Sequence, residues 1–268
     1  MLTEKISKTI DKNVQAQLFK YTAMTIIAYV SLMLTASIIL IFAFDFPDIL
    51  REPVDKMLGL FYSNRNITVP AYYVFVLSGI AFVMMVALLY KAITPRESTS
   101  GFLALISGIL FGVLSNLGFI RWPFLMDYLG KVISDPAVND MQKQTVEIVF
   151  NAFHNYAGVA VGENFAFWFE GFWVLFFSIS IARQDKLFPR YMTKIGYIIA
   201  AGMFVYTLEQ FGGIFTVLGE INVIIHAGFL MWLLGISVLL LKKRPELGKI
   251  SAGLLIIGYF VLLATAYM

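Results

Sequence analysis

Seven polar side chains stand out in this 268-residue sequence because they lie within or beside long apolar segments and could form a binding site. They are Glu170, His226, Glu209, Asn222, His154, Arg121 and Glu163. Ionisable side chains are costly inside a membrane, so they normally face a protein interior or a water-filled cavity there. Carboxylates and imidazoles can bind polar ligands and exchange protons. The sequence therefore predicts a ligand-binding site built from these seven residues.

Glu170 and His226 form the centre of this predicted site. Glu170 lies in an aromatic run seven positions after Glu163, and His226 lies six positions after Glu220. At the rise of an α-helix, each is about 9–10 Å along its helix from the preceding glutamate. We expect the two side chains to meet at one level in an outer-facing acidic pocket. Arg121 is the expected partner of one of the carboxylates.

Most members of the site also have a purely structural interpretation. Glu163 and Glu209 could lie at the water interface, and His154 could be an exposed or interfacial residue. His226 could donate a single hydrogen bond to a neighbouring helix. Glu170 is the hardest to explain in this way, because aromatic residues precede and follow it in the sequence.

The composition excludes several kinds of chemistry. The chain has no cysteine, so disulfides, thiol catalysis, iron–sulfur clusters and cysteine-based zinc sites are excluded. Its two histidines form no His-Glu-x-x-His or His-x-x-x-His motif, and residues 250–268 have no lysine for a retinal Schiff base. The histidines could ligate a haem iron, but no other feature supports haem. We predict no metal site, and catalytic residues and cofactors stay unassigned.

Membrane-spanning helices are the elements that must position these side chains. Of all residues, 59% are hydrophobic and only 14% are charged, and the mean hydropathy is +0.80. A helix of about 20 apolar residues is long enough to cross a bilayer. Such segments are found at 20–44, 71–93, 101–120, 164–182, 193–211, 221–241 and 250–268. The predicted fold is an all-α, seven-transmembrane helix bundle in one domain over residues 20–268, which excludes a soluble enzyme and a nucleic-acid-binding module.

The distribution of lysine and arginine predicts the orientation of this bundle. Fourteen of the 20 basic residues fall in the N-terminal segment and the loops on its side of the membrane, and the other six fall on the opposite side. Loops rich in Lys and Arg stay in the cytoplasm. We expect an integral protein of the plasma or inner membrane, with its N-terminus in the cytoplasm and its C-terminus outside.

Three segments outside the spans are also expected to be helical. Residues 1–19 carry apolar side chains four positions apart, which is typical of an amphipathic helix on the cytoplasmic membrane surface, and equally of a solvated helix that packs on a loop. A short interfacial helix is expected at 53–62. The long outer loop at 121–163 is expected to contain a helix that begins at Asp135-Pro136.

Aromatic and glycine residues have structural interpretations. Tyr72 and Trp122 are among the side chains expected to anchor the helices at the membrane interface. Gly108 and Gly112 form a small-x-x-x-small pair that favours close helix packing, and Gly228 and Gly235, one heptad apart, are expected to act similarly.

Several short motifs in the second half of the chain occur together in one family. They are His154-Asn-Tyr, Phe169-Glu-Gly171-Phe172, Lys186-Leu-Phe188-Pro189, Lys194-Ile-Gly196 and Trp232-Leu-Leu-Gly235. Over roughly a third of its length, the chain resembles an uncharacterised family of bacterial polytopic integral membrane proteins, known as a domain of unknown function. The resemblance implies that His154 and the fourth span matter, and it implies no particular reaction or ligand.

Three functions remain open. The favoured one is a sensor- or transporter-like protein that binds a small molecule or a lipid headgroup in the acidic pocket. The second is a membrane-embedded, metal-dependent hydrolase or transferase, with Glu170 as general base and His226 as metal ligand or acid. The third is a structural or accessory subunit of a membrane complex. Expected partners are the lipid bilayer, a small-molecule or lipid ligand, and another copy of the chain or a membrane-complex subunit, but no nucleic acid.

Overall fold

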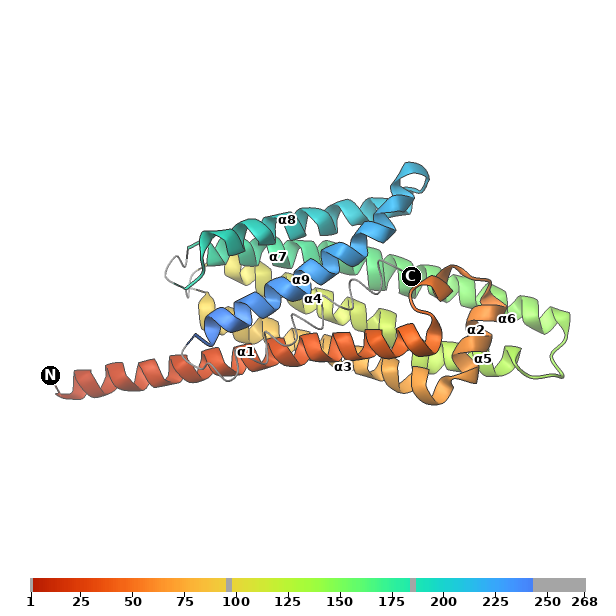
Figure 1. The fold of residues 1–268 in the computed structure, drawn as a ribbon, viewed down its shortest axis with the longest axis horizontal. Coiled ribbons are helices and arrows are strands. Elements are labelled where there is room, and N and C mark those ends of the chain that lie inside the picture. The colour runs from red at the N-terminus through yellow and green to blue at the C-terminus, as the bar shows by residue number, and fades with distance from the viewer. Residues whose placement is uncertain (1, 95–97, 184–186, 243–268) are drawn as a thin grey trace. The chain divides into compact units, whose positions relative to one another are not determined.

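The structure is a computed structural model that describes residues 2–94, 98–183 and 187–242 (Figure 1). Within these residues every regular element is helical, which confirms the predicted all-α class for the described chain. The helices are α1 (Leu2–Phe44), α2 (Val54–Ser63), α3 (Arg65–Ile93), α4 (Thr99–Arg121), α5 (Asp127–Ile133), α6 (Asp140–Phe153), α7 (Ala166–Ile181), α8 (Arg190–Tyr206) and α9 (Leu218–Leu240).

Six helical stretches of the described chain are long and apolar enough to cross a membrane. They are Asn13–Phe44, Arg65–Ile93, Thr99–Ile133, Asp140–Ile181, Arg190–Phe211 and Ile221–Leu240. Each overlaps one of the first six predicted spans. The seventh predicted span, 250–268, lies outside the described residues.

The N-terminal segment is part of the first spanning helix. Residues 1–19 were expected to form a separate surface helix, but α1 is one continuous helix from Leu2 to Phe44 (Figure 1). The position of this segment on the membrane surface stays a prediction, as does the single transmembrane domain over residues 20–268.

The prediction of a long outer loop at 121–163 is wrong for most of its length. The helix that begins at Thr99 continues through a π-helical segment, Trp122–Met126, into α5. Pro123 has no N–H group to donate, and the wider π turn keeps the chain helical past it. Only residues 134–139 separate α5 from α6.

The helix predicted to begin at Asp135-Pro136 begins four residues later. Asp135 Oδ1 accepts a hydrogen bond from the backbone N–H of Ala137 at 2.8 Å, so this side chain closes a turn instead of capping a helix. Asn139 and Gln142 form a capping box with two hydrogen bonds of 2.9 Å, and α6 starts at Asp140.

The chain divides into two compact units, which are described separately. The first unit comprises Met1–Val30, Ala81–Leu110 and Phe167–Met268. The second unit comprises Ser31–Ile80 and Phe111–Ala166.

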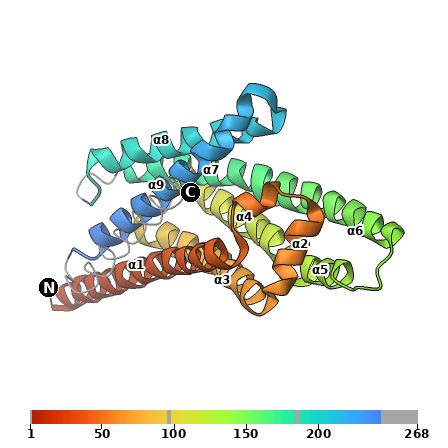
Figure 2. The same ribbon diagram turned by 45° about the vertical axis from the view of Figure 1, so that its right-hand side comes forward.

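Aromatic side chains hold the helices of the first unit together. Trp173 on α7 contacts Phe82 on α3 and Phe229 on α9, with ring centroids 5.1 and 5.8 Å apart. α8 and α9 lie side by side (Figures 1 and 2), and Nε1 of Trp232 on α9 donates to the carbonyl oxygen of Met192 on α8 at 2.9 Å. These contacts combine apolar burial with a satisfied indole N–H group.

Gly108 on α4 allows close packing within the first unit. A Cβ atom at Gly108 would lie 2.6 Å from the Trp173 indole and 2.7 Å from Val86 of α3, which is too close for either neighbour. At Gly235 a Cβ atom would lie 3.3 Å from Met192 Cε on α8, whereas at Gly228 it would meet no heavy atom of the described residues within 4 Å. The predicted close packing is therefore confirmed at Gly108 and Gly235 and is not found at Gly228 among the described residues.

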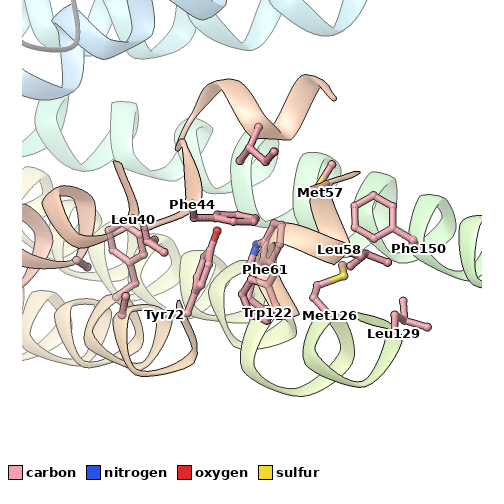
Figure 3. Close-up of a cluster of buried hydrophobic side chains, with 14 of the residues drawn as sticks. Leu40, Phe44, Met57, Leu58, Phe61, Tyr72, Trp122, Met126, Leu129 and Phe150 are labelled. Atoms are coloured by element: carbon pink, nitrogen blue, oxygen red, sulfur yellow. The ribbon is translucent and has the colours of Figure 1, made fainter. Parts of the chain in front are cut away.

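A cluster of buried aromatic side chains forms the core of the second unit (Figure 3). Tyr72 stacks on Trp122 with ring centroids 4.8 Å apart, and Phe44 packs edge-on against Trp122 and Phe61 at 5.2 and 5.5 Å. Tyr72 and Trp122 are each only 2% exposed, so the prediction that they are interfacial anchors is wrong. Full burial of their large apolar area inside the cluster stabilises the fold more than partial exposure at the edge of the cluster would.

The short helix predicted at 53–62 is confirmed as α2, which packs against α5 and α6 in the second unit. The start of α3 is tied to α5 by a bidentate ion pair, in which Arg65 Nε and Nη2 donate to the two Asp127 carboxylate oxygens at 2.9 and 2.8 Å. Two parallel hydrogen bonds give this pair a defined geometry.

Replacement of Gly108 by alanine tests the packing of the first unit. We expect Gly108→Ala to lower the free energy of unfolding by about 1–3 kcal/mol, because Trp173 and Val86 must move to admit the methyl group. Gly228→Ala is the matched control, since alanine favours a helix over glycine by about 1 kcal/mol and meets no neighbour there among the described residues. Thermal or denaturant unfolding of the detergent-purified protein measures both. Equal effects of the two substitutions would contradict the packing around Gly108.

Candidate functional site

The seven predicted site residues are divided between the two units. The first unit contains Glu170, Glu209, Asn222 and His226, and the second unit contains Arg121, His154 and Glu163. Among the described residues, no three His, Asp or Glu side chains gather in a group that could hold a metal ion.

Glu170 on α7 and His226 on α9 are in direct contact in the first unit. Glu170 Oε2 lies 3.2 Å from His226 Nε2. The Glu170 side chain is completely buried, whereas 27% of the His226 side chain is exposed. Helical rise places the two groups at one level, and the packing of α7 and α9 turns their side chains toward each other.

The hydrogen-bond partners of His226 indicate where its protons lie. Nδ1 is 3.1 Å from the main-chain carbonyl oxygen of Asn222, which can only accept, so Nδ1 carries a proton. One further proton lies between His226 Nε2 and Glu170 Oε2. Either an imidazolium donates to a carboxylate, or a carboxylic acid donates to a neutral imidazole, and the pair is electrically neutral in both arrangements.

Aromatic rings lie beside this neutral pair. The His226 ring packs against Phe167, one turn before Glu170, with ring centroids 4.8 Å apart. Phe167 in turn packs edge-on against Tyr206 at the end of α8, at 5.0 Å. An unpaired charge in such apolar surroundings costs several kcal/mol, roughly, because it loses its hydration. Neutrality explains how a carboxyl group can be buried there.

Two buried acceptor atoms belong to the site. Glu170 Oε1 and Asn222 Oδ1 accept no hydrogen bond from any residue that the structure describes. Asn222 lies one helical turn before His226 on α9. Glu209 lies in the 3-10 turn after α8 and is half-buried, and no hydrogen bond between described residues joins its side chain to Glu170 or His226. The site can therefore accept hydrogen bonds and exchange one proton.

In the second unit, Arg121 and His154 are in contact. Arg121 Nη1 donates to the carbonyl oxygen of Gly118 at 2.6 Å, and Nη2 lies 3.5 Å from His154 Nδ1. Since a guanidinium can only donate, His154 Nδ1 is the acceptor, and the ring proton lies on Nε2. Arg121 also interacts electrostatically with Glu163, which is the carboxylate that partners it in the second unit.

An irregular helix makes room for this arginine. Residues His154–Phe165 form a π-helical segment between α6 and α7. A Cβ atom at Gly158 would overlap the Arg121 guanidinium, and a Cβ atom at Gly162 would lie 2.6 Å from the Cα atom of Gly118. Two glycines on this segment therefore let the arginine and the neighbouring backbone approach closely.

Tyr72 is a polar neighbour of this arginine that the sequence did not reveal. Its hydroxyl oxygen and Arg121 Nε are buried and hydrogen-bond to no described residue. Tyr72 interacts electrostatically with both Arg121 and Glu163. The adjacent Tyr73 is 43% exposed, so residue type and position do not distinguish the two tyrosines. Gly158 was also missed, although its spacing of four residues from His154 placed it on the same helix face.

The fold and these buried ionisable groups define the chain as a polytopic, all-α integral membrane protein. It belongs to the family described as Domain of unknown function (DUF4386), which matches residues 20–243. This match confirms the resemblance to an uncharacterised family and extends it well beyond the short motifs. No curated protein and no solved structure is significantly similar to the chain.

Removal of the Glu170 carboxyl group tests the buried pair. We expect Glu170→Ala to lower the free energy of unfolding by about 2–3 kcal/mol, because His226 Nε2 loses its partner among aromatic rings. Glu170→Gln can still donate to Nε2 and should cost about 1 kcal/mol. Unfolding of the purified protein in detergent measures these changes.

The exposed Glu147 on α6 provides the matched control, and Glu147→Ala should change stability by less than about 0.5 kcal/mol. In a double-mutant cycle, Glu170→Ala and His226→Ala should be non-additive by about 1 kcal/mol or more. Additive effects would show that the two side chains do not stabilise each other.

Proposed function

We propose that this protein binds a small molecule or a lipid headgroup at the Glu170–His226 pair, as a sensor or a transporter does. One observation carries the proposal: the Glu170 carboxyl group is completely buried, and among the described residues only one of its two oxygens has a hydrogen-bond partner. A carboxyl group at membrane depth is costly, and ionisable side chains there commonly serve a substrate, an ion or a proton. A role in the binding of a ligand accounts for that cost.

The ligand should carry hydrogen-bond donors. Glu170 Oε1 and Asn222 Oδ1 are both acceptors, and a buried acceptor without a partner costs about 1–3 kcal/mol. A hydroxyl, amide or ammonium group in the ligand would satisfy them. The exposed part of the His226 ring provides a route of contact with such a group. A ligand without donors would leave both oxygens unpaired.

The other predicted residues have more distant roles in the proposal. Glu209 is half-buried in the 3-10 turn after α8, and its contribution to ligand binding stays a prediction. Arg121, His154 and Glu163 interact with one another in the second unit, and their contribution to ligand binding stays a prediction.

We also propose that residues 250–268 form a seventh span, with the N-terminus in the cytoplasm and the C-terminus outside, in the plasma or inner membrane. The excess of lysine and arginine in the N-terminal segment and in the alternate loops supports this orientation. The Glu170–His226 pair then belongs to the outer half of the bundle.

Cysteine labelling tests the orientation without background, because the chain has no cysteine. The exposed residues Ser134 and Arg183 and the terminal Met268 are each replaced by cysteine and treated in intact cells with a membrane-impermeant maleimide. We expect Ser134→Cys and Met268→Cys to be labelled, and Arg183→Cys to be labelled only after lysis. Labelling of Met268→Cys only after lysis would refute a seventh span, and the reverse pattern at Ser134 and Arg183 would refute the orientation.

Ligand-induced stabilisation tests the binding site. The detergent-purified protein is heated with free ethanolamine, phosphatidylethanolamine, phosphatidylglycerol or phosphatidylcholine. We expect at least one donor-bearing probe to stabilise the wild type, by about 2.7 kcal/mol at 100 times its Kd. Phosphatidylcholine should not stabilise it in this way, because its headgroup has no hydrogen-bond donor. Free ethanolamine and the lipids distinguish a soluble ligand from a headgroup.

Substitutions separate this site from unspecific lipid effects. Glu170→Gln should abolish the stabilisation, whereas Glu147→Gln, on the exposed face of α6, should retain it. Equal stabilisation of wild type and Glu170→Gln, or the absence of any effect from the donor-bearing probes, would contradict the proposed function.

A further inference from the structure

We infer, on the basis of the proposed function, that the Glu170–His226 site takes a primary ammonium group and releases one proton to the solvent for each ammonium that it binds. The ligand class is thus a primary ammonium, and its binding is coupled to the release of a proton. It depends on the hydrogen-bond geometry of His226 and on the burial of Glu170.

Acceptor atoms on Glu170, Asn222 and His226 match the donors of an ammonium group in kind. Glu170 Oε1 and Asn222 Oδ1 are buried without a donor from the described residues. His226 Nε2 and Glu170 Oε2 both become acceptors once the proton that they share has left, because Nδ1 keeps its own proton, which it donates to the Asn222 carbonyl oxygen. A primary ammonium has three N–H donors and no acceptor. A quaternary ammonium has none, and a hydroxyl group has only one.

Charge balance explains the release of a proton. The unoccupied pair is neutral because it holds one shared proton between Glu170 Oε2 and His226 Nε2. If an ammonium entered and this proton stayed, the buried site would carry one net positive charge, which apolar surroundings disfavour. If the proton leaves, carboxylate, neutral imidazole and ammonium again sum to zero. The site is therefore neutral with either a proton or an ammonium ion.

The neighbouring titratable groups do not change this balance. Tyr29 on α1 interacts electrostatically with Glu170, and Tyr206 on α8 packs on Phe167, whose ring contacts His226. Phenols are uncharged near neutral pH. Among the described residues, His226 is the cationic partner that lies within ion-pair distance of Glu170. These two phenols therefore leave the charge of the pair unchanged, and Glu209 in the turn after Tyr206 makes no hydrogen bond to either member of the pair among the described contacts.

The pH dependence of binding follows from this exchange. A ligand that displaces a proton binds more weakly in acid, and for one proton the apparent Kd rises about tenfold for each unit by which the pH is lowered. A proton gradient across the membrane would then load the site on the alkaline side and unload it on the acidic side. Such a site suits a proton-coupled transporter or a sensor of amines.

Calorimetric titration of the full-length protein in detergent tests the inference. Free ethanolamine is titrated at one pH in two buffers of different ionisation enthalpy, and the difference in heat gives the number of protons released. We expect about one proton per bound ethanolamine, and an apparent Kd about tenfold higher at pH 7 than at pH 8. Choline and ethylene glycol are the controls, since choline has no N–H donor and ethylene glycol carries no charge.

The outcomes distinguish this inference from the proposed function. Binding of ethanolamine without proton release, or with a Kd independent of pH, overturns the inference and leaves the binding site intact. Binding of phosphatidylglycerol but not of ethanolamine or phosphatidylethanolamine would show that the ligand is not an ammonium, and the proposed binding site would stand. If Glu170→Gln releases as many protons as the wild type, the proton comes from another group, and the inference is overturned. Phosphatidylethanolamine in the same titration shows whether a lipid headgroup replaces the free amine.

Discussion

The burial of the Glu170 carboxyl group among aromatic side chains is the physical constraint on which the first unit depends. A lone carboxylate there would lose its hydration without compensation. His226 compensates by sharing a proton at 3.2 Å, and the Asn222 carbonyl oxygen orients the imidazole by accepting from Nδ1. The contact requires α7 and α9 to hold one rotation and one level relative to each other. The packing of Trp173 on Phe229 and of Trp232 on α8 maintains that arrangement.

The second unit also buries an ionisable side chain, Arg121, and satisfies it with different groups. Arg121 cannot lose its proton, so its donors need acceptors, and the backbone supplies part of them through the Gly118 carbonyl oxygen. The π-helical segment His154–Phe165 presents an imidazole, a glycine at the guanidinium and the Glu163 carboxylate from a single stretch of chain.

Several structural errors of the sequence-based prediction share one cause. A hydropathy pattern detects apolar length but not the path of the backbone, so the helix that continues past Arg121 was interpreted as a loop. The Asp135 side chain suits a cap and a turn equally well, and its hydrogen bond to Ala137 decides for the turn. Tyr72 and Trp122 have the composition of interfacial anchors, but contacts with Phe44 and Phe61 bury them. These outcomes depend on residues distant in sequence.

The sequence alone determined the helical class, the family, the first six spans and the depth of Glu170 and His226 along their helices. The family follows from the resemblance of short motifs, and the other three follow from composition, periodicity or a fixed rise per residue, which are local properties. Only the tertiary structure decided that the carboxyl group and the imidazole face each other, that Arg121 contacts His154 and Gly158, and that two acceptor atoms stay unpaired among the described residues. Helix rotation and side-chain direction depend on packing between distant segments, and no local pattern contains that information.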